Sequence, residues 1–273
     1  MNQSLANSNE QAAALAFGSQ APVFDRLYGN DTIIAYKRMR VRMHMEQFIN
    51  GRSQLLELNA GTGEDAIYFA SKGHSIHATD IAQPMLDQLQ EKKKQTTWAD
   101  RISTEQCSFT ALDTLQQRGP YDHVYSNFAG LNCTQHLDQV IQSMGSLVKK
   151  GGYITLVLLP SFCLWETMLL FRGKFRTAFR RFTGKKGAAA KVEQKGFRCW
   201  YYAPSLVKKM AAKEFIYIRH EGLCSLVPPS YMEGFAENHP RLYQWLVKKE
   251  NRNGGKRPWR NWGDYYIITF RKK

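Results

Sequence analysis

The hydrophobic and polar positions of the chain form two alternating patterns. Short apolar runs indicate buried strands, whereas apolar residues repeated every three or four positions indicate helices with one buried face. The predicted strands are residues 54–58, 75–79, 102–107, 121–126, 153–159, 215–226 and 264–270, and the helices between and after them are residues 64–72, 84–94, 136–148, 204–214 and 231–251. This alternation across short turns predicts an α/β fold, in which helices cover both faces of a parallel sheet.

Three segments depart from this alternation. Residues 1–10 are polar and lack the basic and apolar regions of a secretory signal, so we expect a frayed terminus. Residues 21–48 have apolar positions at helical spacing, which predicts helices that are interrupted near residues 29 and 30. Residues 162–196 contain no obvious strand, and their part 184–195, rich in Lys, Ala and Gly, predicts a mobile loop.

The composition is that of a globular protein. The chain has 273 residues, of which 43% are hydrophobic and 22% charged, and this excludes disordered and fibrous classes. The longest apolar run, residues 153–165, contains Pro160 and is shorter than the roughly 20 residues that cross a bilayer. Five widely spaced cysteines form no Cys-x-x-Cys pair, so we expect no disulfide framework and no metal site. A reducing cytoplasm is the predicted location.

Charge is distributed unevenly along the chain. Residues 1–150 contain 14 Lys and Arg against 15 Asp and Glu, a net charge of −1, whereas residues 151–273 contain 24 against 8, a net charge of +16. This asymmetry favours an anionic partner for the C-terminal half, such as a phosphate-bearing substrate, an acidic carrier protein, a nucleic acid or a membrane surface. The alternative is a solvated basic surface that keeps the protein in solution.

The most specific pattern is a strand that passes through a glycine-rich turn into a helix, at residues 54–66. Glycines at 61 and 63 allow a tight turn and a close approach of the backbone to a ligand, and the following helix offers free N–H groups. Asp80 follows 17 residues after Gly63, at the end of the second strand. A carboxylate there can accept hydrogen bonds from both hydroxyls of a ribose. The pair predicts a site for a nucleoside-containing cofactor.

The spacing Gly61-x-Gly63-x-x-Ala66 also matches the fingerprint for dinucleotides. A pyrophosphate needs a helix N-terminus that is free of anions, but Glu57 precedes this turn and residues 64 and 65 are both acidic. Negative charge around the turn suits a cofactor with cationic centres, such as a sulfonium and an ammonium. We therefore favour such a cofactor over a nicotinamide.

At these residues the sequence resembles the class I S-adenosylmethionine-dependent methyltransferases of the small-molecule branch, whose first motif is acid-x-Gly-x-Gly-x-Gly. The resemblance covers residues 54–159 by motif and extends to residue 270 by strand order. It implies a Rossmann-like sheet of seven strands, the last antiparallel, with S-adenosylmethionine as cofactor, S-adenosylhomocysteine as product and no metal. The cofactor-binding residues that it implies are Tyr28, Glu57, Asn59, Ala60, Gly61, Gly63, Asp80, Ile81, Met85, Ser108, Asn127 and Phe128.

Two positions depart from the family pattern. Asn59 replaces the first glycine of the motif, and the turn can persist because Asn adopts positive φ more readily than most residues. After the third strand, where family members often place an acid against the adenine, this chain has residues 107–109, of which Ser108 is the candidate contact. Residues 126–133 also look like methyltransferases from bacterial aryl-polyene and flexirubin-type pigment clusters.

The acceptor is expected beyond the carboxyl ends of the first and fourth strands, at the topological switch point. Asn127 and Phe128 follow the fourth strand, and Asn127 is a candidate for orienting the acceptor or the cofactor. Asn132 is a candidate substrate contact or a helix cap. His136 is the candidate general base if the acceptor arrives protonated, with His44 as an alternative, although a surface position is common for either.

Residues 161–197 are predicted to form a lid inserted after the fifth strand, as in small-molecule methyltransferases. Phe171, Phe175, Phe179 and Phe182 recur at helical spacing among basic residues, which predicts a basic amphipathic helix that is apolar towards the pocket. Phe162 and Trp165 at its start are candidate substrate contacts. Such a lid suits a hydrophobic acceptor from an acidic carrier protein or an anionic membrane surface, and the alternative is a helix with a solvated basic face.

The predicted organisation has four parts. Residues 1–50 form helices over the cofactor site, 51–160 the cofactor-binding core, 161–197 the lid, and 198–273 the rest of the same sheet. We expect a methyltransferase for a hydrophobic or aromatic small molecule. The rivals are an RNA methyltransferase, since several Trp and Tyr could stack bases, and a non-catalytic protein with this fold; without a recognisable RNA-binding module, nucleic acid is the less favoured partner.

Overall fold

The computed structural model describes residues 2–273, and all their side chains except those of residues 2–7, 172 and 185. Its central sheet has seven strands in the order β3-β2-β1-β4-β5-β9-β8. They are β1 (Gln54–Leu58), β2 (Ser75–Asp80), β3 (Ile102–Gln106), β4 (Tyr121–Ser126), β5 (Val148–Leu158), β8 (Phe215–Leu223) and β9 (Tyr265–Lys272). β9 is antiparallel to both of its neighbours, and the other pairings within this sheet are parallel. The predicted fold class is confirmed.

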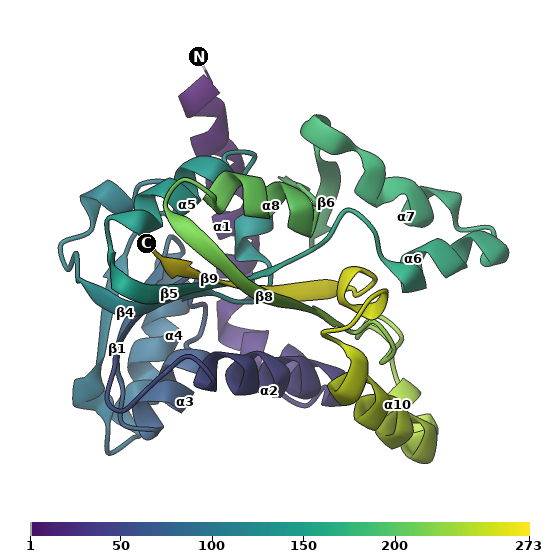
Figure 1. The fold of residues 1–273 in the computed structure, drawn as a ribbon, viewed down its shortest axis with the longest axis horizontal. Helices are drawn as coiled ribbons and strands as arrows, with labels where there is room; N and C mark the ends of the chain where they lie inside the picture. The colour runs from purple at the N-terminus through teal and green to yellow at the C-terminus, as the bar shows by residue number, and fades with distance from the viewer. Residues whose placement is uncertain (1) are drawn as a thin grey trace.

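Helices cover both faces of this sheet (Figure 1). One face carries α5 (Leu137–Gly145) and α8 (Pro204–Ala211), and the other carries α2 (Thr32–Glu46), α3 (Glu64–Ser71), α4 (Gln83–Lys94) and α10 (Pro240–Asn253). The alternation of side chains along a strand divides the core: Leu55 packs with the α2 side, and Leu56 with the α5 side. Burial on both faces explains why the central strands are continuous apolar runs.

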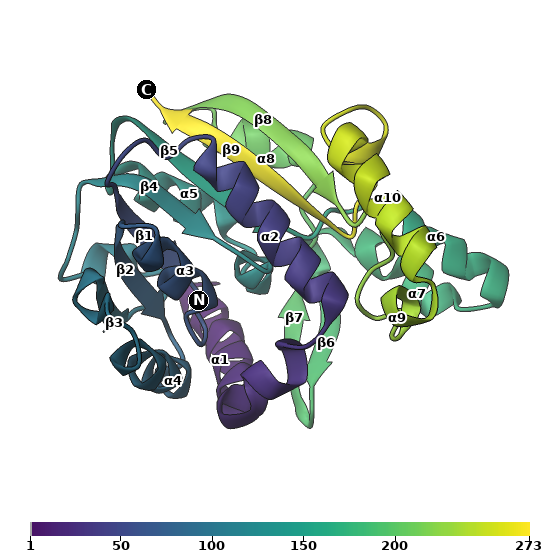
Figure 2. The ribbon, with the colours of Figure 1, turned by 90° about the horizontal axis from the view of Figure 1, so that it is seen from below.

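The N-terminus is ordered as a long helix, so the expectation of a frayed terminus is wrong. α1 (Asn2–Tyr28) lies against α4 and against the hairpin strand β7 (Figure 2). Its buried positions include Ala13, Ala16 and Ala21. These small side chains let the helix approach its neighbours closely, but they give a weak hydrophobic signal, which is why the polar sequence around them did not predict a packed helix.

The stretch predicted as a mobile loop is instead an antiparallel hairpin. It consists of β6 (Ala188–Val192) and β7 (Lys195–Cys199). Asn9 of α1 fixes β7, because its side chain accepts from the Arg198 N–H at 2.6 Å and donates to the Arg198 carbonyl at 3.1 Å. The hairpin thus depends on a partner more than 180 residues away, and a local pattern could not predict it.

The segment after β5, which we call the lobe (residues 164–186), is not one amphipathic helix. It contains α6 (Leu164–Met168), α7 (Phe175–Phe179) and three short 3-10 turns, at residues 169–172, 180–182 and 184–186, with a break at Gly173. The four phenylalanines are 91%, 61%, 56% and 57% exposed, in chain order. The prediction that they face the pocket is wrong. Among the described residues, no helix has both the length and the apolar content to cross a membrane.

Candidate functional site

A cavity of about 360 Å³ lies at the edge of the sheet where β1, β2 and β4 end. Its floor is formed by the glycine-rich turn after β1 and by the residues that follow β2 and β4. α1 and α2 cover it, and the start of β9 closes one end. The site therefore lies where open α/β sheets bind their ligands, outside the carboxyl ends of the strands.

The turn after β1 has the backbone conformation that its sequence predicts. Asn59, Gly61 and Gly63 have φ values of 50°, 56° and 79°. A Cβ on Gly63 would lie 2.1 Å from a Leu89 methyl group, so this glycine allows α3 to approach α4. A Cβ on Gly61 would meet nothing within 4 Å, which leaves open space above the turn. Gly61 lines the cavity, whereas Gly63 lies outside the lining and acts through the packing of α3 against α4.

Asn59 occupies the position of the missing glycine without filling the cavity floor. Its amide group donates to the Asn127 carbonyl at 2.9 Å and accepts from the Ser126 hydroxyl at 2.5 Å. The side chain thus points along the sheet edge to the end of β4 and joins the two loops that form the floor. Asn is therefore accommodated at position 59 through hydrogen bonds to the end of β4 and to the loop that follows it.

Asp80 is placed to hold two neighbouring hydroxyls. Its two carboxylate oxygens accept the Gly61 N–H at 2.9 Å and the Ala82 N–H at 2.8 Å. Each oxygen has a second lone pair available for a ligand in the cavity. Burial raises the pKa of Asp80, although the hydrogen bonds from Ala82 and Gly61 oppose the shift.

Glu57 has a carboxylate oxygen with no partner. The side chain is 3% exposed and lines the cavity, and its Oε2 atom is buried without a hydrogen bond. Burial, followed by the nearby Asp65, raises the pKa of Glu57 well above its ordinary value. Asp65 is itself neutralised by Arg42 at 2.7 Å and Arg38 at 3.6 Å. The side chain of Tyr125 opposes the upward shift in the pKa of Glu57, and a cationic ligand in the cavity would also favour the charged carboxylate.

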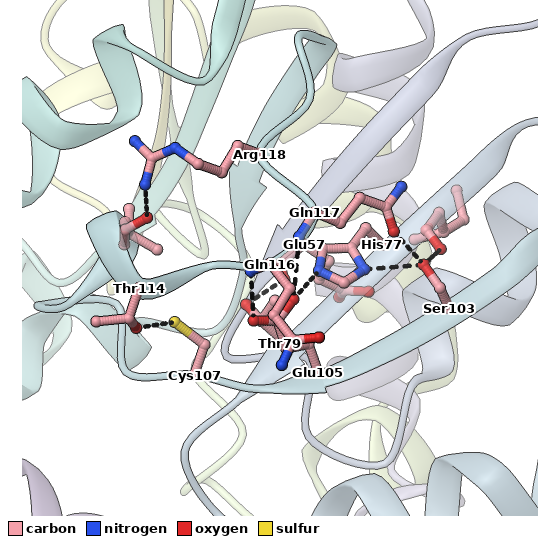
Figure 3. Close-up of polar contacts among 12 residues, drawn as sticks. Glu57, His77, Thr79, Ser103, Glu105, Cys107, Thr114, Gln116, Gln117 and Arg118 are labelled. Atoms are coloured by element: carbon pink, nitrogen blue, oxygen red, sulfur yellow. Dashed lines mark hydrogen bonds and ion pairs between the residues drawn. The ribbon is translucent and has the colours of Figure 1, made fainter.

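The end of the cavity near β2 is apolar and is covered by α1. Ile81, Met85 and Phe109 line it together with Phe17. Ser108 lies outside the lining, where its hydroxyl donates to Glu10 of α1 at 2.6 Å. The neighbouring Cys107 contacts Thr114 within its own loop, as Figure 3 shows.

The opposite end of the cavity lies between β4 and β9. Asn127 donates to Asp65 at 2.7 Å and accepts from the Phe128 N–H at 2.7 Å. Phe128 has the unusual φ of 48°, a conformation that is costly for a bulky residue and typical of functional sites. Its ring faces the Arg38 guanidinium at 4.9 Å, and Tyr265 lines the far wall.

The remaining predicted site residues are divided between lining and non-lining positions. Tyr28 and Ala60 line the cavity. Asn132 is fully buried outside it, where it bonds the backbone of Leu159 and Trp200. His136, Phe162 and Trp165 also lie outside the lining, and among the described residues no histidine lines the cavity. His44 is buried between Glu221 and Thr269.

The lining also includes residues that the sequence did not single out, among them Glu10, Phe17, Lys37, Arg38, Ser230 and Tyr265. A signal for Lys37 was present. It lies four residues after Ile33 and four before Val41, and both of these are buried on the inner face of α2. A lysine at such a position requires a polar partner, and this requirement could have marked it.

The strand order, the acid-glycine turn and Asp80 at the end of β2 define the class I methyltransferase fold. Residues 55–152 match the family model of a methyltransferase domain. The chain therefore has the class I S-adenosylmethionine-dependent methyltransferase fold, and residues 55–152 are the part that matches this family model.

Relatives with known names are distant. The chain is 23% identical over 198 residues to the biotin biosynthesis bifunctional protein BioHC of Cellvibrio japonicus; the match covers 72% of this chain and 37% of that protein. The chain thus spans little more than a third of this relative. It is also similar to a SAM-dependent methyltransferase of Methanosarcina mazei, with TM-score 0.58, 13% identity and coverage of 84% of this chain and 96% of that one.

A third similar protein has a bound product. This is 1,6-didemethyltoxoflavin-N1-methyltransferase of Burkholderia thailandensis, solved with 1,6-didemethyltoxoflavin and S-adenosylhomocysteine. The TM-score is 0.57 at 16% identity, over 97% of this chain and 89% of that one. At such identities the likeness shows the shared fold.

Proposed function

We propose that this protein transfers a methyl group from S-adenosylmethionine to a hydrophobic or aromatic small molecule. The observation that carries the proposal is the buried, unpartnered Oε2 of Glu57 at the edge of β1. An amino group is the ligand that would satisfy it, and Asp80 retains acceptor capacity for ribose hydroxyls nearby. The charge and spacing of these two groups suit the cofactor that the fold family uses.

Each part of the cofactor has a candidate partner among the lining residues. Glu57 would hold the amino group of the methionine moiety, and Asp80 the ribose. Ile81 and Met85 would pack against the adenine, under the cover of α1. Phe128 would face the sulfonium, whose bound methyl group is what the cofactor supplies for transfer.

The acceptor end supports an aromatic or hydrophobic substrate. Phe128 and Tyr265 line the cavity beyond Asn127, with their ring centres 6.5 Å apart. Aromatic walls orient a flat acceptor by stacking, and in-line transfer depends largely on such positioning. The Burkholderia enzyme, which is described with a heteroaromatic acceptor, is a precedent within this fold.

Calorimetric titration with S-adenosylhomocysteine and, separately, with NADH tests the cofactor. We expect micromolar binding of S-adenosylhomocysteine and at least about a tenfold loss of affinity in Asp80→Ala, since a charged hydrogen-bond acceptor is worth about 1.5–3 kcal/mol. Asp87→Ala on the exposed side of α4 is the matched control and should bind normally. Binding of NADH alone, or of neither compound, would contradict the proposal.

We further propose that the lobe places the protein on an anionic lipid surface, from which a hydrophobic acceptor is drawn. Glu166, the lobe's single acid, is 1% exposed and paired with Arg180 and Arg181. The outer surface of the lobe therefore combines exposed phenylalanines with cations such as Lys174 and Arg176. In Figure 1 the lobe lies at one end of the molecule's long axis. Protruding aromatic and basic groups are the features with which proteins bind membrane interfaces.

A further inference from the structure

Lys37 is a buried cation that lacks a carboxylate partner. Its side chain extends from α2 to the end of the cavity near β9 and is 3% exposed. The ammonium donates to the Ser230 hydroxyl at 3.0 Å and lies 4.7 Å from the centre of the Tyr265 ring. Within residues 2–273, it forms no ion pair. An ammonium has three donors, and this environment uses one of them on a neutral oxygen.

The other cations on the same helix are neutralised. Arg40 is paired with Glu221, and Arg42 with Asp65. Arg38 lies 3.6 Å from Asp65 and over the Phe128 ring. Taking a charge out of water is expensive unless an opposite charge or several hydrogen bonds compensate it. Lys37 is the exception on α2, and it is also the residue whose ammonium reaches the acceptor end of the cavity.

The side chain keeps its charge in this position. Burial lowers the pKa of Lys37, but Tyr265, Cys224, Asp264 and Asp31 raise it, and the net direction is upward. Lys37 is therefore an ammonium at neutral pH. A group that brings a negative charge into the cavity would gain both the ion pair and the two remaining donors.

The position along the sheet separates Lys37 from the nucleoside end of the site. Asp80 ends β2, whereas Tyr265 begins β9, and β1, β4 and β5 lie between them. With neighbouring strands about 4.8 Å apart, these two points are separated by roughly 19 Å along the sheet edge. A ligand bound to Asp80 and Glu57 occupies the part of the cavity beside β2 and β1. Lys37 therefore lies at the opposite end of the cavity, beyond this ligand.

We propose that Lys37 and Ser230 form an oxyanion subsite, which holds an acceptor carrying a carboxylate or phenolate oxygen. The inference rests on the proposed methyl transfer and names the class of its acceptor. In the reaction the anionic oxygen attacks the methyl carbon, the carbon–sulfur bond breaks, and its electron pair stays on sulfur as the sulfonium becomes a neutral thioether. No proton is released. An acceptor bound as an anion needs no general base, which agrees with a cavity lining without histidine in the described residues.

Matched pairs of acids and amides test this subsite. Acetate, benzoate, cinnamate and decanoate, each beside its primary amide, are titrated into protein saturated with S-adenosylhomocysteine. We expect at least one acid to bind more tightly than its amide, and Lys37→Met to weaken that acid at least about tenfold while leaving the amide unchanged. Lys37→Arg should retain part of the preference for the acid over its amide. Lys94→Met, at an exposed position, should retain all of this preference. An unaltered thermal unfolding midpoint shows that a variant is folded.

The cofactor's own carboxylate is the other possible source of the negative charge. The affinities of S-adenosylhomocysteine and of 5′-methylthioadenosine, which lacks the carboxylate, are therefore measured in wild type and Lys37→Met. Equal affinities in both proteins support the acceptor subsite. A loss confined to S-adenosylhomocysteine would assign Lys37 to the cofactor and overturn the proposal, as would an acid panel without any preference over the amides. If wild type binds neither nucleoside, the proposed function fails, and the acid panel on the free protein still decides the subsite.

Discussion

α1 and the lobe both carry apolar residues outside the central sheet, and they differ in what these residues contact. α1 turns Ala13, Ala14 and Phe17 to the cavity and packs against α4 and β7. The lobe turns its phenylalanines to solvent and is attached through the buried Arg181. A polar sequence with small residues thus forms the cover, while a sequence with a strong aromatic periodicity forms an outer surface.

The difference shows that periodicity identifies an apolar face but not its partner. Phe171, Phe175, Phe179 and Phe182 were predicted to form one helix face towards the pocket, but they belong to separate short helical segments and are exposed. Arg181, which bonds Glu166 and Asp264, is the basic residue of this segment that points inward, while Lys174 and Arg176 are exposed together with the phenylalanines. In α1 the buried face consists largely of alanines, which pack closely but give only a weak hydrophobic pattern in the sequence.

The largest expected effect is on the attachment of the lobe. Arg181→Met leaves the buried Asp264 without its cation and Glu166 with Arg180 alone, so we expect a loss of about 3–5 kcal/mol in the free energy of unfolding, measured by urea titration. Arg176→Met, an exposed position in the same lobe, should change it by less than about 0.5 kcal/mol. Similar losses in both variants would mean that Arg181 is not the anchor.

The cover formed by α1 is tested by filling the cavity beneath it. Ala14→Trp places a large side chain in the space proposed for the cofactor, and we expect at least about a tenfold loss of affinity for S-adenosylhomocysteine in calorimetry. Leu15→Trp is the matched control, since Leu15 is 64% exposed on the same helix. Normal binding by the Ala14 variant would show that α1 does not cover the ligand.

The outer surface of the lobe is tested with vesicles. The full chain should sediment with phosphatidylcholine vesicles that contain phosphatidylglycerol, and less with phosphatidylcholine alone. The double variant Phe171→Asp/Phe175→Asp should bind the anionic vesicles at least about tenfold less, because burying each Phe contributes up to about 1.5–3 kcal/mol. It should bind S-adenosylhomocysteine normally, as should Met43→Asp on α2, which should also bind vesicles like wild type.

Two results would contradict this lipid proposal. One is equal sedimentation with neutral and anionic vesicles. The other is retention by an acidic carrier protein without any binding to vesicles, which would assign the same phenylalanines and cations to a protein partner.

The smallest expected effect is a pH response of opposite sign in the two segments. Burial raises the pKa of Glu10, which fixes α1 to Ser108 and Thr110. With α1 packed, Glu10 therefore holds a proton at pH values above 4.5, its ordinary pKa, at which an exposed Glu10 would be ionised. The packing of α1 is for this reason stabilised as pH falls towards 4.5. Burial also opposes ionisation of Glu166, but hydrogen bonds from Arg180 and Arg181 lower its pKa overall. The lobe therefore loosens as pH falls below 4.5.

Amide hydrogen exchange, corrected for the intrinsic rate at each pH, measures both responses. Protection of α1 should rise from pH 7 to about 4.5, and protection of the lobe should fall below it. Glu10→Gln should make the α1 profile flat without altering that of the lobe. A parallel loss of protection in both segments would indicate global acid unfolding instead.

The sequence predicted the sheet and the cofactor end of the site because their signals are local. Strand, turn and helix follow one another within residues 54–80, and Glu57, Gly61 and Asp80 come together through a single β-α-β unit. The acceptor end could not be predicted in this way. Lys37, Ser230 and Tyr265 come from three separate parts of the chain, and only packing of α2 on the sheet brings them together.

Asn59 has a consequence for the evolution of this fold. A Cβ on Gly130 would lie 2.4 Å from the Asn59 side chain, so the two positions share one volume. A side chain at 59 excludes one at 130, and a glycine at 59 would permit one there. Homologues should therefore change positions 59 and 130 together. A homologue with glycine at 59 could have a larger residue at 130, and one with asparagine at 59 should keep glycine at 130.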